Sequence, residues 1–422
     1  MSNLEGLVSK IEIPRMIKVR QNFPNKTLED VPMAIRQELC RDEIIGRIKK
    51  GDRVALTVGS RGISNMSIII REIVSIIKEK GAHPFLVPTM GSHGGATAEG
   101  QEEILKEFGI TEEFTGAPIR ATMEVVQVGT SKNGLPVCID KYAYTEADAI
   151  VVIGRIKPHT SFRGAIESGL AKMIVIGLGK QIGAEICHAV GIEQMASRIE
   201  EIARVAIEKS KIVFGVGIIE NAYDETSKIV SIPSERIMNE EPKLLIEAKA
   251  NMPSILFDKC DVLIVDEMGK NITGTGMDPN IIKRHCAGSV KHDPLTQKIV
   301  VLDLTKETHG NAAGMGNADV CSRKFFDKID FSSTNANPLT NRLTQTVKIP
   351  MVMENDSQAI RACIKTCFDV DYDNIKIIRI KNTLKLQEIY ISENMLEESK
   401  AISGIEIIGE PEFMKFDQHG NL

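Results

Sequence analysis

The sequence lacks several features that would place it in a common functional class. It contains no tryptophan, and aromatic residues make up only 4% of its 422 residues, so a stacking surface for bases or sugar rings has little material. Its formal net charge is only -5 at pH 7, and no long run of lysine and arginine gives the electrostatic footprint of a nucleic-acid or membrane-surface protein. We therefore expect a small-molecule partner, with no nucleic acid and no membrane.

Long apolar runs and paired cysteines are also missing. No stretch approaches the roughly 18 apolar residues of a membrane span, and the N-terminus lacks a basic segment followed by an apolar run. The eight cysteines are scattered, and only Cys363 and Cys367 lie close together, at helical rather than CxxC spacing. These absences predict a cytoplasmic protein with reduced thiols, without a disulfide framework or a thiolate zinc site.

The pattern of apolar residues predicts an α/β fold. Short apolar runs, such as residues 53–58, alternate with segments of helical periodicity, such as residues 68–77. This alternation indicates mostly parallel, helix-flanked sheets, and the length of the chain indicates two α/β domains around a central cleft. We expect an N-terminal domain over residues 1–250 that carries the chemistry and is joined by residues 402–422. A C-terminal domain over residues 251–401 would close the cleft.

A stretch in the middle of the chain combines His159, Lys172 and His188. The apolar run Met173 to Ile176 comes directly after the lysine and is followed by glycines, which predicts a strand whose carboxyl end presents this stretch at a sheet edge. A lysine flanked by two imidazoles at such an edge is a candidate covalent anchor or base. A salt bridge between Lys172 and Glu167 is the structural alternative.

Other candidate site residues lie in glycine-bearing loops that follow predicted strands. One loop contains Arg61 and a second contains His93, while Lys270 and Asn271 lie in a comparable loop of the second domain. Backbone amides and cations in such loops suit a carboxylate or a phosphate. We expect the histidines to converge on one cleft, although ordinary loop side chains remain the alternative for each, and no HExxH zinc motif is present.

On these loops the sequence resembles the nickel-dependent lactate racemase family, a group of 2-hydroxyacid racemases and epimerases, over essentially the whole chain. The matching pieces are Gly59-Ser60-Arg61, Gly91-Ser92-His93, Pro158-His159, and Lys172 with His188 sixteen residues later. The resemblance implies that Lys172 forms a thioamide with a nickel-pincer nucleotide, a nickel pyridinium-3-thioamide-5-thiocarboxylic acid mononucleotide, which dedicated maturation enzymes supply. It also implies that His188 binds the nickel.

The resemblance further implies the roles of the remaining residues and the reaction. His93 and His159 would exchange the substrate hydroxyl proton from opposite faces, and Arg61 would bind the carboxylate. A hydride would leave C2 for the cofactor and return, through a 2-oxo acid. The polar loop around Arg163, with Lys270 and Asn271 in the other domain, indicates a hydrophilic substrate, such as a sugar acid or a hydroxydicarboxylate, rather than lactate.

Two other classes of function fit parts of the sequence. The segment Gly177 to Gly183 would suit an NAD(P)-dependent oxidoreductase of a hydroxy acid, but its spacing is GxGxxxG rather than GxGxxG. A non-catalytic small-acid binding protein could also be built from two domains around a cleft. Deuterium at C2 of the substrate separates the three, since a racemase transfers it internally, a dehydrogenase passes it to a soluble cofactor, and a binding protein leaves it in place.

Overall fold

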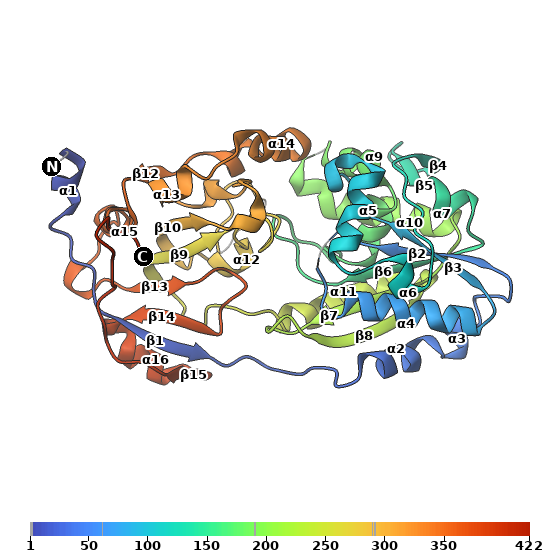
Figure 1. Cartoon of the computed structure of the whole chain (residues 1–422), viewed down its shortest axis with the longest axis horizontal. Coiled ribbons are helices and arrows are strands. Elements are labelled where there is room, and N and C mark those ends of the chain that lie inside the picture. Colours follow the sequence, from blue (N-terminus) through green and yellow to red (C-terminus); the bar gives the residue numbers. More distant parts are fainter. Residues whose placement is uncertain (1–2, 61, 190, 289, 291–292) are drawn as a thin grey trace. The chain divides into compact units, whose positions relative to one another are not determined.

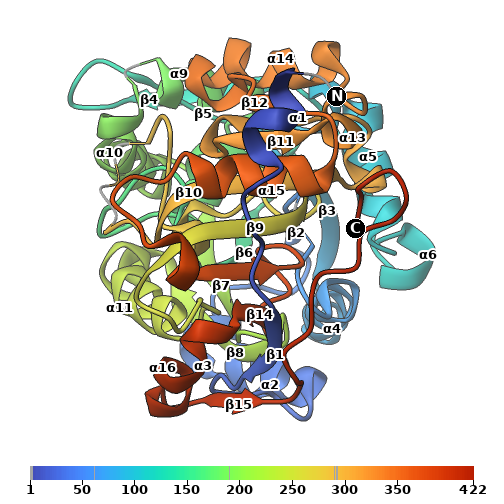
Figure 2. The same ribbon diagram turned by 90° about the vertical axis from the view of Figure 1, so that its left-hand side faces the viewer.

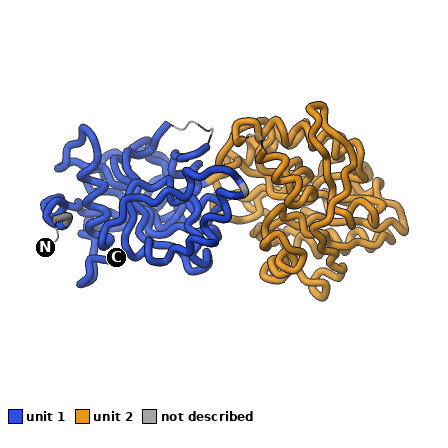
Figure 3. Tube along the Cα trace, turned by 90° about the horizontal axis from the view of Figure 1, so that it is seen from above, with its two compact units in different colours: residues 1–23, 253–422 blue, residues 24–252 orange. Residues whose placement is uncertain are grey.

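The computed structural model describes residues 3–60, 62–189, 191–288, 290 and 293–422. The chain divides into unit 2, Pro24–Met252, and unit 1, which combines Met1–Phe23 with Pro253–Leu422 (Figure 3). Each unit contains a sheet with helices against it, so the chain has the predicted α/β fold with mostly parallel, helix-flanked sheets. Within the described ranges, no helix combines the length and the apolar character needed to cross a membrane.

The sheet of unit 2 has five strands in the order β3-β2-β6-β7-β8. Their bounds are Arg53–Val58 for β2, His83–Pro88 for β3, Ala149–Arg155 for β6, Ile212–Glu220 for β7 and Thr226–Pro233 for β8. Strands β3, β2, β6 and β7 run parallel, and β8 pairs antiparallel with β7. Because the carboxyl ends of parallel strands share one edge of a sheet, the loops after β2, β3 and β6 emerge together.

Helices cover both faces of this sheet (Figure 1). Ile150 of β6 packs into one hydrophobic core with α10 (Met195–Lys209) and α11 (Ile237–Ala250), and its neighbour Val151 packs into the other core with α4 (Met66–Glu79). Burial on both faces explains why β6 is a continuous apolar run rather than an alternating one. The other elements of unit 2 are α2 (Val31–Leu39), α3 (Asp42–Ile45), α5 (Ala98–Glu107), α6 (Glu112–Thr115), α7 (Lys141–Thr145) and the antiparallel pair β4 (Val125–Thr130) and β5 (Pro136–Asp140).

The segment after Lys172 is helical, so the prediction of a strand at Met173 to Ile176 is wrong. Lys172 ends α8 (Leu170–Lys172), and it is followed by the π-helical turn η2 (Met173–Gly177) and by α9 (Lys180–His188). A short buried apolar run fits a helix as well as a strand, and here the run packs against the sheet edge without joining the sheet. Single π-helical turns of this kind occur often at functional sites.

The sheet of unit 1 has eight strands in the order β12-β11-β10-β9-β13-β14-β1-β15. Strands β12, β11, β10, β9 and β13 run parallel to one another, whereas the pairs β13–β14, β14–β1 and β1–β15 are antiparallel. The strands are β1 (Met16–Gln21), β9 (Cys260–Met268), β10 (Thr296–Leu304), β11 (Val320–Ser322), β12 (Met351–Met353), β13 (Ile377–Ile380), β14 (Glu388–Ser392) and β15 (Ile405–Ile407). The helices are α1 (Asn3–Val8), α12 (Pro279–Ile282), α13 (Arg323–Phe326), α14 (Phe331–Asn341), α15 (Asp356–Lys365) and α16 (Leu396–Ala401).

Both chain termini belong to unit 1, which differs from the expected domain bounds of 1–250 with 402–422. Strand β1 lies between β14 and β15 in the eight-stranded sheet, where Val19 is paired with Ile389 on one side and Ile407 on the other (Figures 1 and 2). These backbone ladders join the first 23 residues and the C-terminal tail to the sheet formed after residue 253. The physical reason is strand pairing between segments almost four hundred residues apart, which local sequence patterns do not reveal.

Candidate active site

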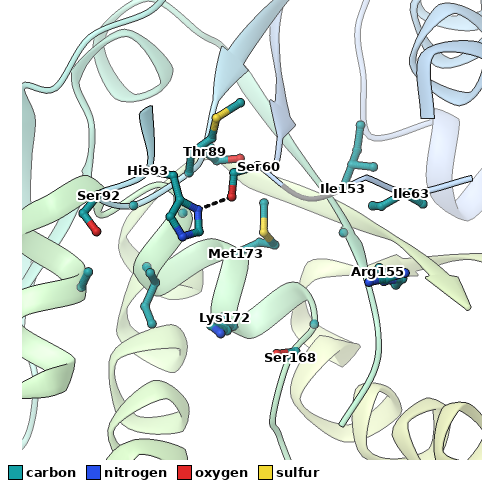
Figure 4. A pocket seen from close by; sticks show the side chains of 18 of the residues that line it. Ser60, Ile63, Thr89, Ser92, His93, Ile153, Arg155, Ser168, Lys172 and Met173 are labelled. Atoms are coloured by element: carbon teal, nitrogen blue, oxygen red, sulfur yellow. Dashed lines mark hydrogen bonds between the residues drawn. The ribbon is translucent and has the colours of Figure 1, made fainter. Parts of the chain in front are cut away.

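A cavity of about 270 Å³ lies at the carboxyl edge of β2, β3 and β6 in unit 2 (Figure 4). Its volume is near the lower end of the range for small-molecule pockets. Its polar lining includes the side chains of Ser60, His93, Lys157, Ser168, Lys172 and His188, and its apolar lining includes Ile63, Ile153, Met173 and Ile176. The structure therefore brings His93, Lys172 and His188 together at one cavity, from three separate segments of the chain.

Lys172 is placed at the cavity by close packing of its helix on the end of β6. A Cβ atom at Gly154, in β6, would lie 2.8 Å from Cγ of Met173, so only glycine allows this approach. The Lys172 side chain is half-buried. The carboxylate of Glu167, which the sequence offered as an alternative partner for Lys172, accepts a hydrogen bond from Nζ of Lys249 at 2.7 Å.

The first turn of the lysine-bearing helix is bound by a buried carboxylate. Oε2 of Glu241, in α11, accepts the backbone N–H of Ala171 at 2.9 Å, and the side chain is only 1% exposed. Burial raises the pKa of Glu241 to about 7, while the amides of Ala171 and Leu170 lower it. Gly169 leaves room for this contact, since a Cβ atom there would lie 2.2 Å from Oε1 of Glu241.

His93 lies in the loop that follows β3. Its Nδ1 atom and the hydroxyl of Ser60, from the loop after β2, share a short hydrogen bond, drawn as a dashed line in Figure 4. Its backbone carbonyl accepts a hydrogen bond from the buried side-chain amide of Gln101 at 3.2 Å. Because a hydroxyl can both donate and accept, Ser60 is compatible with either tautomer of the His93 ring.

His159 lies beside the cavity in the loop after β6, with a more constrained ring. Nδ1 of His159 accepts the backbone N–H of Ser161 at 3.0 Å, and the ring stacks on Phe162 with centroids 4.0 Å apart. The backbone N–H of His159 donates to Oε2 of Glu167 at 2.7 Å. Since Nδ1 is an acceptor, the proton of the neutral ring is on Nε2.

The surroundings of His159 favour its neutral form. Burial lowers the pKa of His159 well below its usual value of 6.5, and the charges of Lys172, Lys157, His188 and Arg163 lower it further. The ring is therefore uncharged at neutral pH. His159 itself is not among the residues that line the cavity, although Lys157, two residues before it, is.

His188 is the last residue of α9, and its half-buried side chain faces the same cavity as Lys172. The neutral imidazole of a histidine is the commonest metal ligand in proteins. Among the residues that the structure describes, no cluster of three or more His, Cys, Asp or Glu side chains is arranged to bind a metal.

The other predicted site residues are Arg61, Lys270 and Asn271. Arg61 lies outside the described residues. Lys270 and Asn271 belong to unit 1, in the loop after β9, where Nζ of Lys270 donates to the carbonyl of Gly274 at 2.6 Å and Oδ1 of Asn271 accepts from the hydroxyl of Thr305 at 2.7 Å. Their role in binding a substrate stays a prediction.

The glycine segment Gly177 to Gly183 does not have the structural context of a dinucleotide-binding turn. Such a turn follows a strand and opens a helix, whereas this segment connects the helical turn η2 to α9. Its glycines instead allow close packing, because a Cβ atom at Gly179 would lie 2.1 Å from the carbonyl oxygen of Val175.

The residues that support the site were not found from the sequence. Gln101, Lys249 and Glu241 lie in ordinary amphipathic helices, and nothing in their sequence neighbourhood distinguishes them from surface residues. Their contacts with the loops of His93 and His159 and with the helix of Lys172 join residues 8 to 82 positions apart. Only the low exposure of Gln101 and Glu241 in the folded chain identifies them.

Comparisons with known proteins agree with this fold. Residues 9–200 match the family model described as the lactate racemase N-terminal domain. The lactate racemase apoprotein from Thermoanaerobacterium thermosaccharolyticum is similar in structure, with a TM-score of 0.52 and 13% sequence identity over 88% of this chain and 99% of that one. A protein from Thermotoga maritima solved by structural genomics is also similar, with a TM-score of 0.54 and 12% identity over 86% and 98% of the two chains. No curated protein sequence matches this chain significantly.

The two kinds of comparison contribute different information. At 12% to 13% identity the solved structures establish the fold, whereas the family match concerns the sequence itself. The matched residues 9–200 include His93, His159, Lys172 and His188. Over these residues the chain is similar to the lactate racemase family.

Proposed function

We propose that the protein is a racemase or 2-epimerase of a 2-hydroxy acid. The match of residues 9–200 to the lactate racemase N-terminal domain, with a fold similar to that of a lactate racemase apoprotein, supports an isomerase of this type. The observation that carries the proposal is the cavity at the sheet edge, where Lys172, His188 and His93 meet and His159 lies alongside. These residues supply an amine, a metal ligand and two acid-base groups within one small volume.

The donor set of the cavity fits a nickel-pincer nucleotide. The amine of Lys172 would form the thioamide, and the imidazole of His188 would bind nickel, which accepts imidazole and sulfur ligands together. When bound, this cofactor supplies a hydride acceptor for C2, so that the weakly acidic Cα proton of a hydroxy acid need not be removed. The chain itself supplies the attachment, the orientation and the proton transfers.

The two histidines would exchange the hydroxyl proton of the substrate, one from each face. His159 is neutral and has its proton on Nε2, so this atom can donate a hydrogen bond to the oxygen of a 2-oxo acid. The bond between Nδ1 of His93 and Ser60 tolerates both tautomers, so His93 can accept a proton and release it again. Each positioned imidazole contributes about 10²- to 10⁴-fold to the rate.

The substrate is expected to be a hydrophilic acid. Lys157, Ser168 and Arg155 line the cavity, and the guanidinium of Arg155 is paired with Glu220. Arg61, Lys270 and Asn271 would bind the carboxylate and the distal polar groups. A kinetic panel tests this expectation, because a preference for short aliphatic hydroxy acids over sugar acids and hydroxydicarboxylates would contradict it.

The decisive experiment combines cofactor loading with an isotope label. The chain is produced with the cofactor-maturation enzymes, the Lys172 peptide is examined by mass spectrometry, and nickel is measured. A substrate deuterated at C2 is then converted. Retention of deuterium in the inverted product is expected. Transfer to added NAD(P), or binding without turnover, would instead favour a dehydrogenase or a binding protein.

A further inference from the structure

A buried ion pair lies beside the cavity and has no part in the proposed chemistry. Nζ of Lys180 lies 3.0 Å from Oδ2 of Asp140, and both side chains are completely buried. Lys180 also has a left-handed backbone conformation, with φ of 54°, which is uncommon for a residue other than glycine. Such a conformation persists only where the surrounding structure requires it.

The ammonium group of Lys180 contacts two further oxygens. It donates to the carbonyl of Pro88 through a short hydrogen bond, and it lies 3.4 Å from Oε1 of Gln101. The amide nitrogen of Gln101 donates in turn to the carbonyls of Gly91, at 3.0 Å, and His93, at 3.2 Å. A continuous polar chain therefore runs from Asp140 through Lys180 and Gln101 to the backbone of His93.

The positions of these residues show which parts of the fold the polar network connects. Pro88 ends β3 and begins the loop that carries His93, so the loop is bound at its start by Lys180 and further along by Gln101. Lys180 itself is the first residue of α9, between Lys172 and His188. The network thus joins the His93 loop to the helical segment that carries both predicted cofactor-binding residues.

The energetics argue against a purely stabilising role. Burial raises the pKa of Asp140 and lowers the pKa of Lys180, so burial opposes both charges and their mutual attraction sustains them. A buried ion pair is weak support for stability, since an apolar pair of equal volume is often as stable. What an apolar pair cannot provide is directed hydrogen bonding to the carbonyls of the His93 loop.

We propose that Lys180 is a positioning residue that, together with Gln101, fixes the His93 loop against the helices of Lys172 and His188. Its effect on turnover rests on the proposed function of His93, whereas its effect on the loop can be measured independently. The alternative is that the ion pair serves folding alone, in which case the loop would be indifferent to the loss of its hydrogen bonds.

Three variants separate the two possibilities. Lys180→Met keeps the length of the side chain and removes the ammonium, but leaves Asp140 buried without its partner. The double variant Lys180→Met with Asp140→Asn removes both charges and should fold more readily. Gln101→Met leaves the ion pair intact and removes the two donors to Gly91 and His93.

The control removes an ion pair with a buried carboxylate far along the chain. Lys324→Met breaks the contact between Nζ of Lys324 and Oδ2 of the buried Asp356, 2.8 Å apart in unit 1. It should lower the melting temperature without touching the His93 loop. Amide exchange is compared at the same number of degrees below the melting temperature of each variant. This comparison separates a local effect from a general loss of stability.

The first measurement is amide hydrogen exchange of the full-length chain without cofactor, followed by mass spectrometry. We expect exchange at residues 89–93 to accelerate by about tenfold or more in all three variants and to be unchanged in Lys324→Met. Unchanged exchange in Gln101→Met, or normal protection in the neutral double variant, would overturn the proposal. If Lys180→Met does not fold, the other two variants decide the question.

The second measurement uses protein loaded by the maturation enzymes. The variants should lose about 10- to 100-fold in kcat, as is typical when supporting contacts of a site are removed, with little change in KM and with the modified Lys172 peptide still present. Full kcat in Gln101→Met would contradict the positioning role. Wild-type protein that is loaded but inactive on every 2-hydroxy acid would refute the proposed function, while the exchange result would still decide the structural claim.

Discussion

The two walls of the cavity are supported by different helices. On one side, the His93 loop is bound by Gln101 of α5 and by Lys180. On the other side, two contacts come from α11, where Lys249 binds Glu167 of the His159 loop and Glu241 binds the helix of Lys172. The same edge of one sheet therefore has two largely separate sets of supports.

This difference also appears in the chemistry of the two imidazoles. The ring of His93 is bonded to a hydroxyl that can reverse its hydrogen bond, whereas the ring of His159 is bonded to a backbone N–H that cannot. One wall therefore permits a change of tautomer and the other fixes it. Each of the following substitutions should affect one wall and leave the other unchanged.

The largest effects are expected from the imidazoles themselves. His93→Asn and His159→Asn should each lower kcat by about 10²- to 10⁴-fold, because each removes one proton-transfer group. Racemisation by the loaded enzyme is followed by polarimetry, and amide exchange reports on both loops. His83→Asn, on the exposed residue that begins β3, is the control. Faster exchange in the loop of the other histidine, in either variant, would contradict the separate support of the two walls.

A pH-dependent effect on the free energy of unfolding is expected from Glu241. Folding raises the pKa of this group from 4.5 to about 7, so the folded state binds the proton more tightly than the unfolded state. Its contribution to stability is complete below pH 4.5 and is lost as the pH rises to about 7, a change of about 3 kcal/mol. Glu241→Gln should lack this loss.

Denaturant unfolding of wild type and Glu241→Gln at pH 4.5 and pH 7.5 measures the difference. The control is Glu240→Gln, which removes a neighbouring carboxylate that is paired with Lys243 in a partly exposed ion pair. If the stability of wild type and Glu241→Gln changes in parallel with pH, the carboxyl group of Glu241 is not protonated in this range, and the assignment is wrong.

A smaller effect on kcat should follow from Glu167→Gln, in the wall of the cavity that α11 supports. The substitution weakens the contact with Lys249 and the acceptor for the backbone of His159, so we expect kcat to fall about 10- to 100-fold. Exchange should accelerate at residues 157–168 and stay normal at residues 89–93. Glu200→Gln, in an exposed pair with Arg204, should leave both unaltered. Faster exchange in both loops would show that the two walls are coupled.

The smallest effect is expected at Ser60, on the α5 side. Ser60→Ala removes one hydrogen bond to His93, worth about 1 kcal/mol, and should lower kcat roughly fivefold. The pH profile of kcat should also shift, because the hydroxyl no longer stabilises either tautomer of the ring. Ser75→Ala, which removes a hydroxyl of α4 bonded to Glu79, is the matched control. An unchanged rate and profile would remove Ser60 from the proton-transfer path.

The sequence predicted the parts of the fold that depend on local patterns. The strands at residues 53–58 and 84–88, with glycine loops after them, were recognisable because apolar runs and turn residues are local signals. The helix after Lys172 was not, since four buried apolar residues fit a helix and a strand alike. The pairing of β1 with β14 and β15 was also beyond local reasoning, because its partners are distant in the sequence.

For the site, the sequence identified side chains but not their supports. His93, Lys172 and His188 drew attention through their residue types and glycine-bearing segments, and the structure brings them to one cavity. Gln101, Lys180 and Glu241 perform no chemistry of their own, and their importance depends on burial and on contacts that only the folded chain creates. Arg61 and the loop of Lys270 and Asn271 stay predictions.

The break in the helix after Lys172 gives a physical meaning to the interval between this residue and His188. Sixteen residues of unbroken α-helix would separate the two Cα atoms by about 24 Å, which is too far for one small cavity. The π-helical turn and the left-handed residue at Lys180 interrupt that straight path, and both side chains line the same space. The interval is therefore a property of a bent segment, in which adding or removing one residue would change the angular phase of His188 as well as its reach.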